Sequence, residues 1–303
     1  MPKITQKKQA IAPYIPLSKK LTNTLLQRSF SEDLNPTLFP SREETIAQNP
    51  QVISLCSQIE DYLTQDCGFC VIKLDSDLIL NNSLILSGFW NLFTSLAKPL
   101  PQYNTGELSF KVYNAGKAPT RNHYSNTNRG GGFHSDGTFL PVTPFYVGLV
   151  CIRQAKFGGE SILIDGRKLY DELSLKNPQA LTWLEKEYLF DCCGQIPGQE
   201  TRAKAIFNPQ TNSPFIQYLR GYIISGHQKS GIPLEAEAAR SLDILDELAA
   251  REKFQSIFKL NPGEMLIFNN HIMLHGRKTF IDGEDDAEKR LMFRLYGGRY
   301  SNY

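Results

Sequence analysis

The sequence predicts a mainly β protein with flanking helices, and three observations support this. From about residue 108 apolar residues come in short runs between turn residues, as in "FYVGLVCIRQA" (145–155) and "ESILID" (160–165). The same pattern returns in "EMLIFNN" (264–270) and "RLMFRLYGG" (290–298). The strongest helical periodicity of the chain, at residues 234–254, lies between these two regions. Strands on either side of that helix need each other to bury their apolar faces, so we expect one domain.

The N-terminal part is predicted to add two helices and a strand. Apolar side chains recur at helical spacing over residues 52–66. Residues 83–98 predict a second, largely buried helix that begins at a capping serine. "GFCVIKL" (68–74), between them, has strand character. We expect residues 1–50 to form an extension packed on a single domain that comprises residues 51–303.

Two further helices are expected after the strand that ends near residue 165. They are "RKLYDEL" (167–173) and "PQALTWLEKEY" (178–188). A polar loop, "AGKAPTRNHYSNTNRGGG" (115–132), is expected between the strand-like region that begins near residue 108 and the strand-like region that begins at residue 145.

The composition excludes several classes of protein. A hydrophobic content of 41% with 18 Phe and 13 Tyr supports a substantial core and argues against disorder. A net charge of +2, from 33 basic and 31 acidic residues, gives no basis for nucleic-acid binding. The longest apolar run, "FYVGLVCI" (145–152), is too short to span a membrane. The N-terminus lacks the apolar segment of a signal peptide, so we expect a cytoplasmic protein.

The cysteines permit a metal or redox site, which we consider the weaker interpretation. Cys67 and Cys70 form a C-x-x-C pair, and Cys192 and Cys193 are adjacent. Two adjacent cysteines make a poor second half for a tetrahedral zinc site. Because "GFCVIKL" (68–74) also predicts a buried strand, we interpret these cysteines as small apolar residues.

A possible metal site lies in "RGGGFHSDGTFLP" (129–141). His134 and Asp136 are two residues apart, and in extended backbone such side chains point to the same face. A third ligand can come from His271 or His275, both in the segment after the long helix. Two histidines and a carboxylate that leave open positions form the facial triad typical of non-haem Fe(II) oxygenases. An H-x-D pair alone is a weak signal, so the rest of the sequence must support it.

Four motifs in order give that support. They are "FHSDGTF" (133–139), "GGESILID" (158–165), "PGEMLIFNNHIMLHGR" (262–277) and "RLMFR" (290–294). With them the chain resembles the Fe(II)/2-oxoglutarate-dependent oxygenases of the taurine dioxygenase and clavaminate synthase-like group. The resemblance runs from "GFCVIKL" (68–74) to the end of the last strand. It implies a double-stranded β-helix, the jelly-roll core of the cupins, covered by helices.

The resemblance also implies the cofactors and the residues that hold them. Fe(II) is expected on His134, Asp136 and His275, the histidine that precedes "GR". The far carboxylate of the cosubstrate 2-oxoglutarate is expected on Arg290 and Ser161. The implied reaction uses O₂, releases succinate and CO₂, and hydroxylates an unactivated C–H bond. A carboxylate at position 136 favours oxygenation or a related oxidation over halogenation, in which a small residue at this position leaves room for chloride.

The last strand supports this interpretation independently of the resemblance. Alternation places Arg290, Met292, Arg294 and Tyr296 on one face. Buried guanidinium groups are costly unless anions meet them, and a dicarboxylate is such an anion. An internal ion pair with Asp or Glu is the alternative, and it suits Arg294 better than Arg290.

The substrate is expected to be a small polar molecule that bears a carboxylate. The resemblance points to an amino acid or an amino-acid-derived metabolite, free or bound to a carrier protein. We expect its contacts among Arg294, at the position that binds an anion in taurine dioxygenase, Asn126, Arg129, Arg220 and Arg277. The loop 115–132 can form part of a lid over the substrate. Two other functions stay open for the same triad: a non-catalytic jelly-roll binding protein and a zinc hydrolase.

Overall fold

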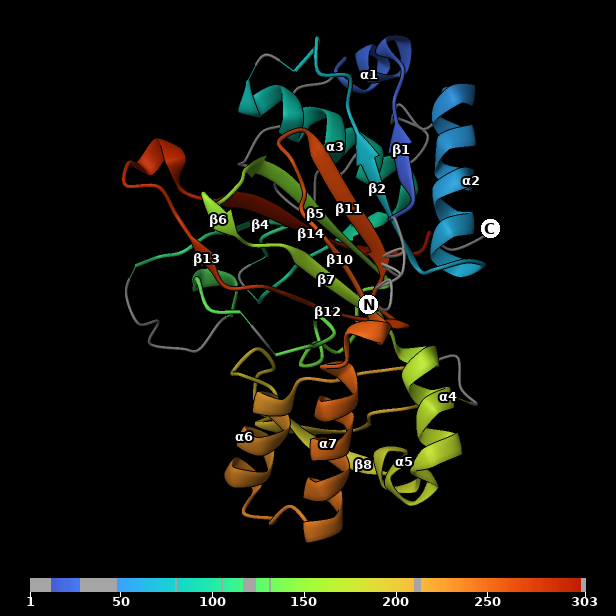
Figure 1. Ribbon diagram of the computed structural model, residues 1–303, viewed down its shortest axis with the longest axis vertical. Coiled ribbons are helices and arrows are strands. Elements are labelled where there is room, and N and C mark those ends of the chain that lie inside the picture. The colour runs from blue at the N-terminus through green and yellow to red at the C-terminus, as the bar shows by residue number, and fades with distance from the viewer. Residues whose placement is uncertain are drawn as a thin grey trace, which may run out of the picture.

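Two β-sheets face each other and form the centre of the molecule (Figure 1). The structure, a computed structural model, describes residues 12–27, 48–79, 81–104, 106–116, 124–130, 132–209 and 214–300. The larger sheet has the strand order β1-β2-β11-β5-β14-β3, with β4 paired to β14. Its strands are β1 (Tyr14–Pro16), β2 (Phe69–Lys73), β3 (Lys98–Leu100), β4 (Ser109–Val112), β5 (Tyr146–Arg153), β11 (Glu264–Asn269) and β14 (Leu291–Gly298).

The smaller sheet has the order β10-β7-β12. Its strands are β7 (Ser161–Asp165), β10 (Gln255–Phe258) and β12 (Met273–Arg277). An apolar cluster between the two sheets includes Leu163 of β7, Phe268 of β11 and Met292 of β14. A two-stranded ribbon of β6 (Phe157–Gly158) and β13 (Phe280–Ile281) extends from this core. Short 3₁₀ helices are η4 (Tyr124–Asn126), η5 (Glu252–Phe254) and η6 (Asp286–Glu288).

The predicted alternation of the last strand is confirmed. Met292 and Tyr296 of β14 belong to the cluster between the sheets. Phe293 and Leu295 belong to the cluster on the opposite face of the same sheet, under the N-terminal helices. The strand therefore has one face toward the interior of the sandwich and one toward the helices, as a period of two residues requires.

Three helices cover the outer face of the larger sheet: α1 (Lys19–Leu25), α2 (Pro50–Thr64) and α3 (Asn82–Leu96) (Figure 1). Helix α2 begins where Asn49 caps it and Pro50 occupies the first turn. The prediction that a serine caps α3 is wrong. The Asn81 side chain accepts a hydrogen bond from the Leu84 amide and caps the helix, because Asn is at least as good an N-cap as Ser.

The chain between β7 and β10 forms a separate lobe at the end of the sandwich, drawn below the sheets in Figure 1. Its elements are α4 (Gly166–Lys176), α5 (Pro178–Leu184), β8 (Glu187–Asp191), β9 (Thr201–Ala205), α6 (Arg220–Ser230) and α7 (Ala236–Ala249). These elements bury an apolar cluster of their own. The prediction of a helix over residues 178–188 is wrong at its end: α5 stops at Leu184, and β8 pairs with β9 because Tyr188 and Phe190 alternate into the cluster.

Helix α6 lies against β8 so closely that only glycine fits at the contact. A Cβ atom at Gly226 would be 2.1 Å from the Leu189 carbonyl oxygen, whereas one at Gly221 of the same helix meets nothing within 4 Å. We expect Gly226→Ala to lower the free energy of unfolding by about 3 kcal/mol, because backbone must move to admit the methyl group. Gly221→Ala, the matched control, should change it by no more than about 1 kcal/mol. Equal denaturant midpoints of the two variants would contradict the expected contact.

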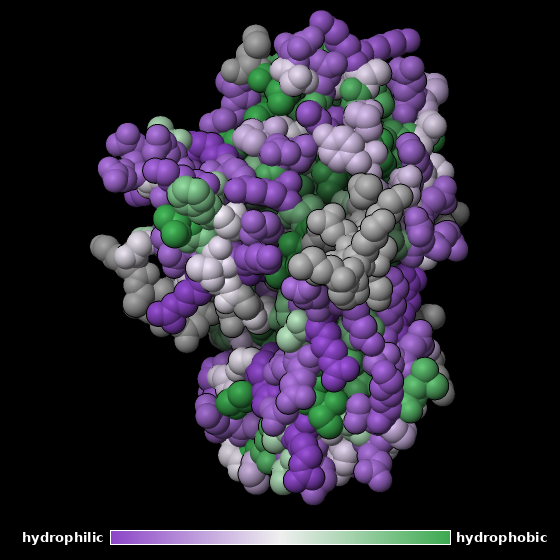
Figure 2. Space-filling model, viewed as in Figure 1, coloured by the Kyte–Doolittle hydropathy of each residue, from purple (hydrophilic) through white to green (hydrophobic). Residues whose placement is uncertain are grey.

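The expected N-terminal extension is described only in part. Strand β1 pairs in parallel with β2 and extends the larger sheet, and the Tyr14 hydroxyl donates to Glu264 Oε1 over 2.9 Å. The division of the chain into an extension (1–50) and a domain (51–303) stays a prediction. Within the described residues, the helices are all too short or too polar to cross a membrane. The face drawn in Figure 2 is largely hydrophilic, with small separate hydrophobic areas.

Candidate metal centre

His134 and His275 are brought together by the backbone. The two residues form an isolated antiparallel bridge, in which the His134 amide donates to the His275 carbonyl over 3.0 Å and the His275 amide donates back over 2.8 Å. His275 lies on β12, so the bridge extends the smaller sheet by one residue pair. The two imidazole rings are 4.2 Å apart between centroids. Two segments far apart in sequence therefore present both rings at one point.

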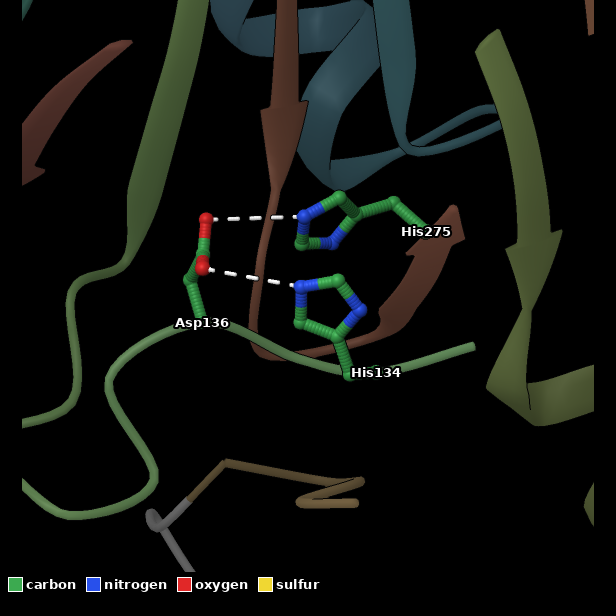
Figure 3. Close-up of side chains that lie close together, drawn as sticks. All are labelled: His134, Asp136 and His275. Atoms are coloured by element: carbon green, nitrogen blue, oxygen red, sulfur yellow. Dashed lines mark ion pairs between the residues drawn. The ribbon is translucent and has the colours of Figure 1, made fainter. Parts of the chain in front are cut away.

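Asp136 completes the group. Its Oδ1 lies 3.9 Å from His134 Nε2, and its Oδ2 lies 3.5 Å from His275 Nε2 (Figure 3). The potential ligand atoms of the three residues all lie within 4.8 Å of one another. Among the described residues, this is the group of histidine, cysteine and carboxylate side chains that can hold a metal ion.

The extended backbone expected at His134 and Asp136 does not form a regular strand. Only His134 makes a bridge, and a turn begins after Ser135 because Gly137 adopts a left-handed φ of 68°. Hydrogen bonds to other segments, rather than a strand ladder, fix the position of this short segment. The Asp136 amide donates to Asn270 Oδ1 over 2.8 Å, and the Ser135 amide donates to the Tyr218 carbonyl over 2.9 Å. Both side chains still converge, as the spacing predicts.

The protonation states suit a divalent metal. His134 Nδ1 lies 3.0 Å from the Gly132 carbonyl oxygen, and since a carbonyl only accepts, Nδ1 carries the hydrogen and Nε2 has the free lone pair. Burial lowers the pKa of both imidazoles, that of His275 to about 3. Burial alone would raise the pKa of Asp136, but Arg294 and the two imidazoles together lower it. Two neutral imidazoles and one carboxylate are donors that Fe(II) accepts.

His271 is not part of this group. Its Nε2 lies 3.2 Å from the Thr143 carbonyl oxygen, and its ring contacts the Phe145 ring at a centroid distance of 4.8 Å. The structure thus places His275, rather than His271, beside His134 and Asp136.

A buried cation with incomplete hydrogen bonding lies in the same interior. Arg290 is only 2% exposed, and its Nε and Nη1 atoms have no hydrogen-bond partner among the residues that the structure describes. Its guanidinium lies 5.2 Å from the centre of the Phe280 ring. Burial lowers the pKa of Arg290 to about 10, which reflects the cost of holding a charge away from water. Such a group requires an anion, and a carboxylate fits two adjacent guanidinium donors.

Arg277 and Ser161 lie near Arg290. The Arg277 guanidinium lies over the same Phe280 ring, 4.9 Å from its centre. Burial and then the charge of Arg290 lower the pKa of Arg277 to about 10. Ser161, 5% exposed, is the cross-strand partner of Arg277 in the β7–β12 pair. Two guanidinium groups thus lie over one ring, and Ser161 is next to one of them across the strands.

A cavity of about 1100 Å³ opens beside the metal group. His134, Asp136, Arg294 and Tyr296 lie at its wall, and residues from the inserted lobe complete it. Two of the loop residues expected to contact substrate, Asn126 and Arg129, line this cavity. Asp191 at the end of β8 and Lys229 of α6, which also line it, were not among the predicted contacts, because neither the hairpin of β8 and β9 nor helix α6 was predicted.

The whole of this arrangement matches one family. The chain fits the taurine catabolism dioxygenase TauD, TfdA family over residues 87–296, more than two thirds of its length. The chain belongs to the TauD/TfdA family. As a member, it is a 2-oxoglutarate-dependent non-haem iron dioxygenase.

Individual relatives agree with this membership. The TauD/TfdA chain is 26% identical to FR-33289 synthase of Streptomyces rubellomurinus over 251 residues, which cover 80% of this chain and 72% of the relative. Three further relatives of 25–26% identity are matched over 41–65% of their own lengths.

Solved structures show the same fold. An asparagine oxygenase in complex with Fe(II), 3-hydroxyasparagine and succinate has a TM-score of 0.69 at 17% identity, with 94% of this chain and 93% of that chain covered. The non-haem iron oxygenase OrfP, in complex with Fe, succinate and (3S)-hydroxy-L-Arg, has a TM-score of 0.69 at 15% identity, with 95% and 94% covered. The predicted jelly-roll fold is therefore confirmed. Both structures hold iron, as the cofactor prediction requires.

In this TauD/TfdA chain, Arg294 is held by groups of the protein. Its Nη1 donates to Asp136 Oδ1 over 2.9 Å, its Nε to Gln102 Oε1 over 2.8 Å, and its Nη2 to the Tyr103 hydroxyl over 3.4 Å. The guanidinium also lies 4.6 Å from the centre of the Tyr296 ring. The internal ion pair, which the sequence left open as an alternative for this residue, is the arrangement found.

Arg220 is a correction to the predicted substrate contacts. It makes ion pairs with Asp243 (2.7 Å) and Asp246 (3.2 Å) of α7 and does not line the cavity, although its neighbours Leu219 and Gly221 do. Its side chain points to the carboxylates of the neighbouring helix because a cation at the start of α6 gains more from them than from the cavity wall.

The cysteines do not form a second metal site in the described residues. All six are free thiols, and Cys70 is fully buried in β2. Burial raises the pKa of Cys67 and of Cys70, so neither is a reactive thiolate.

Proposed function

We propose that this TauD/TfdA enzyme hydroxylates a C–H bond of a small, carboxylate-bearing substrate, an amino acid or an amino-acid-derived metabolite. The observation that carries the proposal is the pairing of a buried His/Asp/His group with a buried guanidinium, two of whose nitrogens have no hydrogen-bond partner in the described part of the chain. In this proposal, His134, Asp136 and His275 hold Fe(II). Arg290, with the Ser161 hydroxyl, binds the far carboxylate of 2-oxoglutarate. A zinc hydrolase would have no use for the cation at Arg290.

When bound, iron and 2-oxoglutarate supply the oxidising chemistry: O₂ is consumed, 2-oxoglutarate becomes succinate and CO₂, and one oxygen atom enters the C–H bond. The protein contributes positioning. The Gly132 carbonyl fixes the tautomer and the orientation of the His134 ring. Arg294 holds one oxygen of Asp136, which favours binding of a metal through the other oxygen. The cavity wall must then hold the target C–H bond near the metal and exclude other hydrogens.

The substrate class draws on the relatives and on the cavity. The compared structures hold hydroxylated asparagine and hydroxylated arginine. The cavity, at about 1100 Å³, lies at the upper limit of ordinary small-molecule sites, so it has room for a substrate larger than a free amino acid. We propose a free or carrier-bound small molecule, no nucleic acid or membrane partner, and a cytoplasmic location. The carboxylate of Asp136 favours oxygenation over halogenation.

The test is an anaerobic titration of the metal-free protein with Fe(II) and then 2-oxoglutarate. Chelation of iron by 2-oxoglutarate should produce a visible metal-to-ligand charge-transfer band. Amino acids and their derivatives are then added one at a time, because a substrate that binds beside the metal perturbs that band. On admission of O₂, the compound that perturbs it should gain one oxygen atom per succinate formed. Bound iron without any band would contradict the proposed cosubstrate site.

A further inference from the structure

We infer that Arg129, rather than Arg294, binds the anionic group of the substrate. This inference rests on the proposed function, since it names a residue that positions the substrate of the same site. Three cationic side chains line the described part of the cavity wall: Arg129, Lys229 and Arg294. They differ in whether a carboxylate of the protein already forms an ion pair with them.

Arg294 is already neutralised by a carboxylate of the protein. Each of its three guanidinium nitrogens already donates a hydrogen bond, one of them to the carboxylate of Asp136. Its side chain is 12% exposed, and that of Asp136 is 5% exposed. Breaking this pair for a substrate anion would leave the buried Asp136 oxygen without its ion-pair partner.

Lys229 is also neutralised. Its ammonium lies 2.8 Å from Asp191 Oδ1. The same carboxylate accepts from the Ser225 hydroxyl over 2.6 Å and from the Cys193 amide over 2.7 Å. Asp191 therefore holds Lys229 in a closed network at the wall of the inserted lobe.

Arg129 differs from both. It is exposed and lines the cavity, and its guanidinium makes no hydrogen bond or ion pair with the described part of the chain. With the other two cations paired, Arg129 is the cation of the described wall that no carboxylate of the described residues compensates. A guanidinium fits a carboxylate with two parallel hydrogen bonds, which gives orientation as well as affinity.

The backbone around Arg129 is fixed, so the guanidinium does not belong to a free loop. Arg277 donates to the carbonyl oxygens of Thr127 and of Arg129, the second over 3.2 Å. The Gly130 amide donates to Thr279 Oγ1 over 3.0 Å. A Cβ atom at Gly130 would lie 2.3 Å from the Thr279 nitrogen, so this glycine permits direct contact of the two backbones.

Arg277 is therefore a positioning residue for the segment that carries Arg129. Its hydrogen bonds to Thr127 and Arg129 explain why an arginine of the "HGR" motif faces the loop before the metal centre. The substrate anion would then bind to Arg129 in the segment 127–130. The target carbon would lie between this segment and the metal group.

The test compares acids with their amides. Wild-type protein loaded anaerobically with Fe(II) and 2-oxoglutarate is titrated with the twenty proteinogenic L-amino acids, and with the C-terminal amide of each one that perturbs the charge-transfer band. We expect Arg129→Gln to weaken binding of the acid at least tenfold and to leave binding of the amide unchanged. Arg129→Lys should recover part of the loss. Arg251→Gln removes an exposed arginine that does not line the cavity, and this variant controls for the change in net charge.

Several outcomes would overturn the inference. Arg129→Gln could bind the acid as wild type does, or Arg294→Gln, with iron saturated, could be the variant that no longer distinguishes acid from amide. A wild-type band that no carboxylate-bearing compound perturbs also counts against it. The band itself separates the two proposals: its presence in Arg129→Gln supports the cosubstrate site whether or not the anion contact is found.

Discussion

Replacing His275 with alanine should abolish the charge-transfer band and turnover. The imidazole supplies one of three donors that converge within 4.8 Å, and two remaining donors hold a divalent ion poorly. We expect Fe(II) affinity to fall on the order of 100-fold or more, a larger effect than the 10–100-fold typical of outer-shell changes. Anaerobic calorimetric titration with Fe(II) measures the change directly.

His271→Ala is the matched control for this variant. His271 lies four residues earlier in the chain, and its ring contacts Phe145 and the Thr143 carbonyl rather than the metal group. We expect its removal to cost about 1 kcal/mol of stability, from one lost hydrogen bond, and to leave Fe(II) affinity within about twofold. Loss of iron in His271→Ala with retention in His275→Ala would reverse the assignment.

Replacing Arg290 with methionine should remove 2-oxoglutarate binding and yet stabilise the protein without cosubstrate. The side chain is 2% exposed, and two of its nitrogens have no hydrogen-bond partner among the described residues, so the ligand-free fold bears a buried charge that Asp282 compensates only in part. An apolar residue of similar length removes that cost. We expect the free energy of unfolding without ligands to rise by about 1–3 kcal/mol, in the range found when buried charges are replaced by apolar groups.

The second half of this prediction concerns the ligand. Binding to the folded state stabilises wild type by about 2.7 kcal/mol at a 2-oxoglutarate concentration 100 times its dissociation constant. Arg290→Met should show no such gain, and Arg290→Lys only a part of it, because an ammonium lacks the planar fork. Denaturant unfolding of metal-loaded protein without 2-oxoglutarate measures the change in stability, and unfolding with 2-oxoglutarate measures the gain that binding adds. A destabilised Arg290→Met that still gains stability from 2-oxoglutarate would refute the assignment.

Sequence by itself determined the elements whose signal is local. The alternation in β14 predicted which side chains face the sandwich and which face the helices, because a strand repeats every two residues wherever it lies. The H-x-D spacing predicted that His134 and Asp136 converge, and the motif before "GR" selected His275. The end of α5 and the strand β8 were missed, since Tyr188 and Phe190 fit a helix or a strand until the partner strand β9 is known.

Tertiary structure decided what each arginine does. Arg220, Arg277, Arg290 and Arg294 were all candidates for an anion in the sequence, and the sequence left open which of them the protein itself neutralises. Arg294 meets Asp136 across 158 positions, and Arg277 meets Arg129 across 148. Two guanidinium nitrogens of Arg290 have no hydrogen-bond partner among the described residues, and Arg220 pairs with α7. The energy of a charge depends on its burial and on its nearest opposite charge, and folding sets both through contacts that no sequence period encodes.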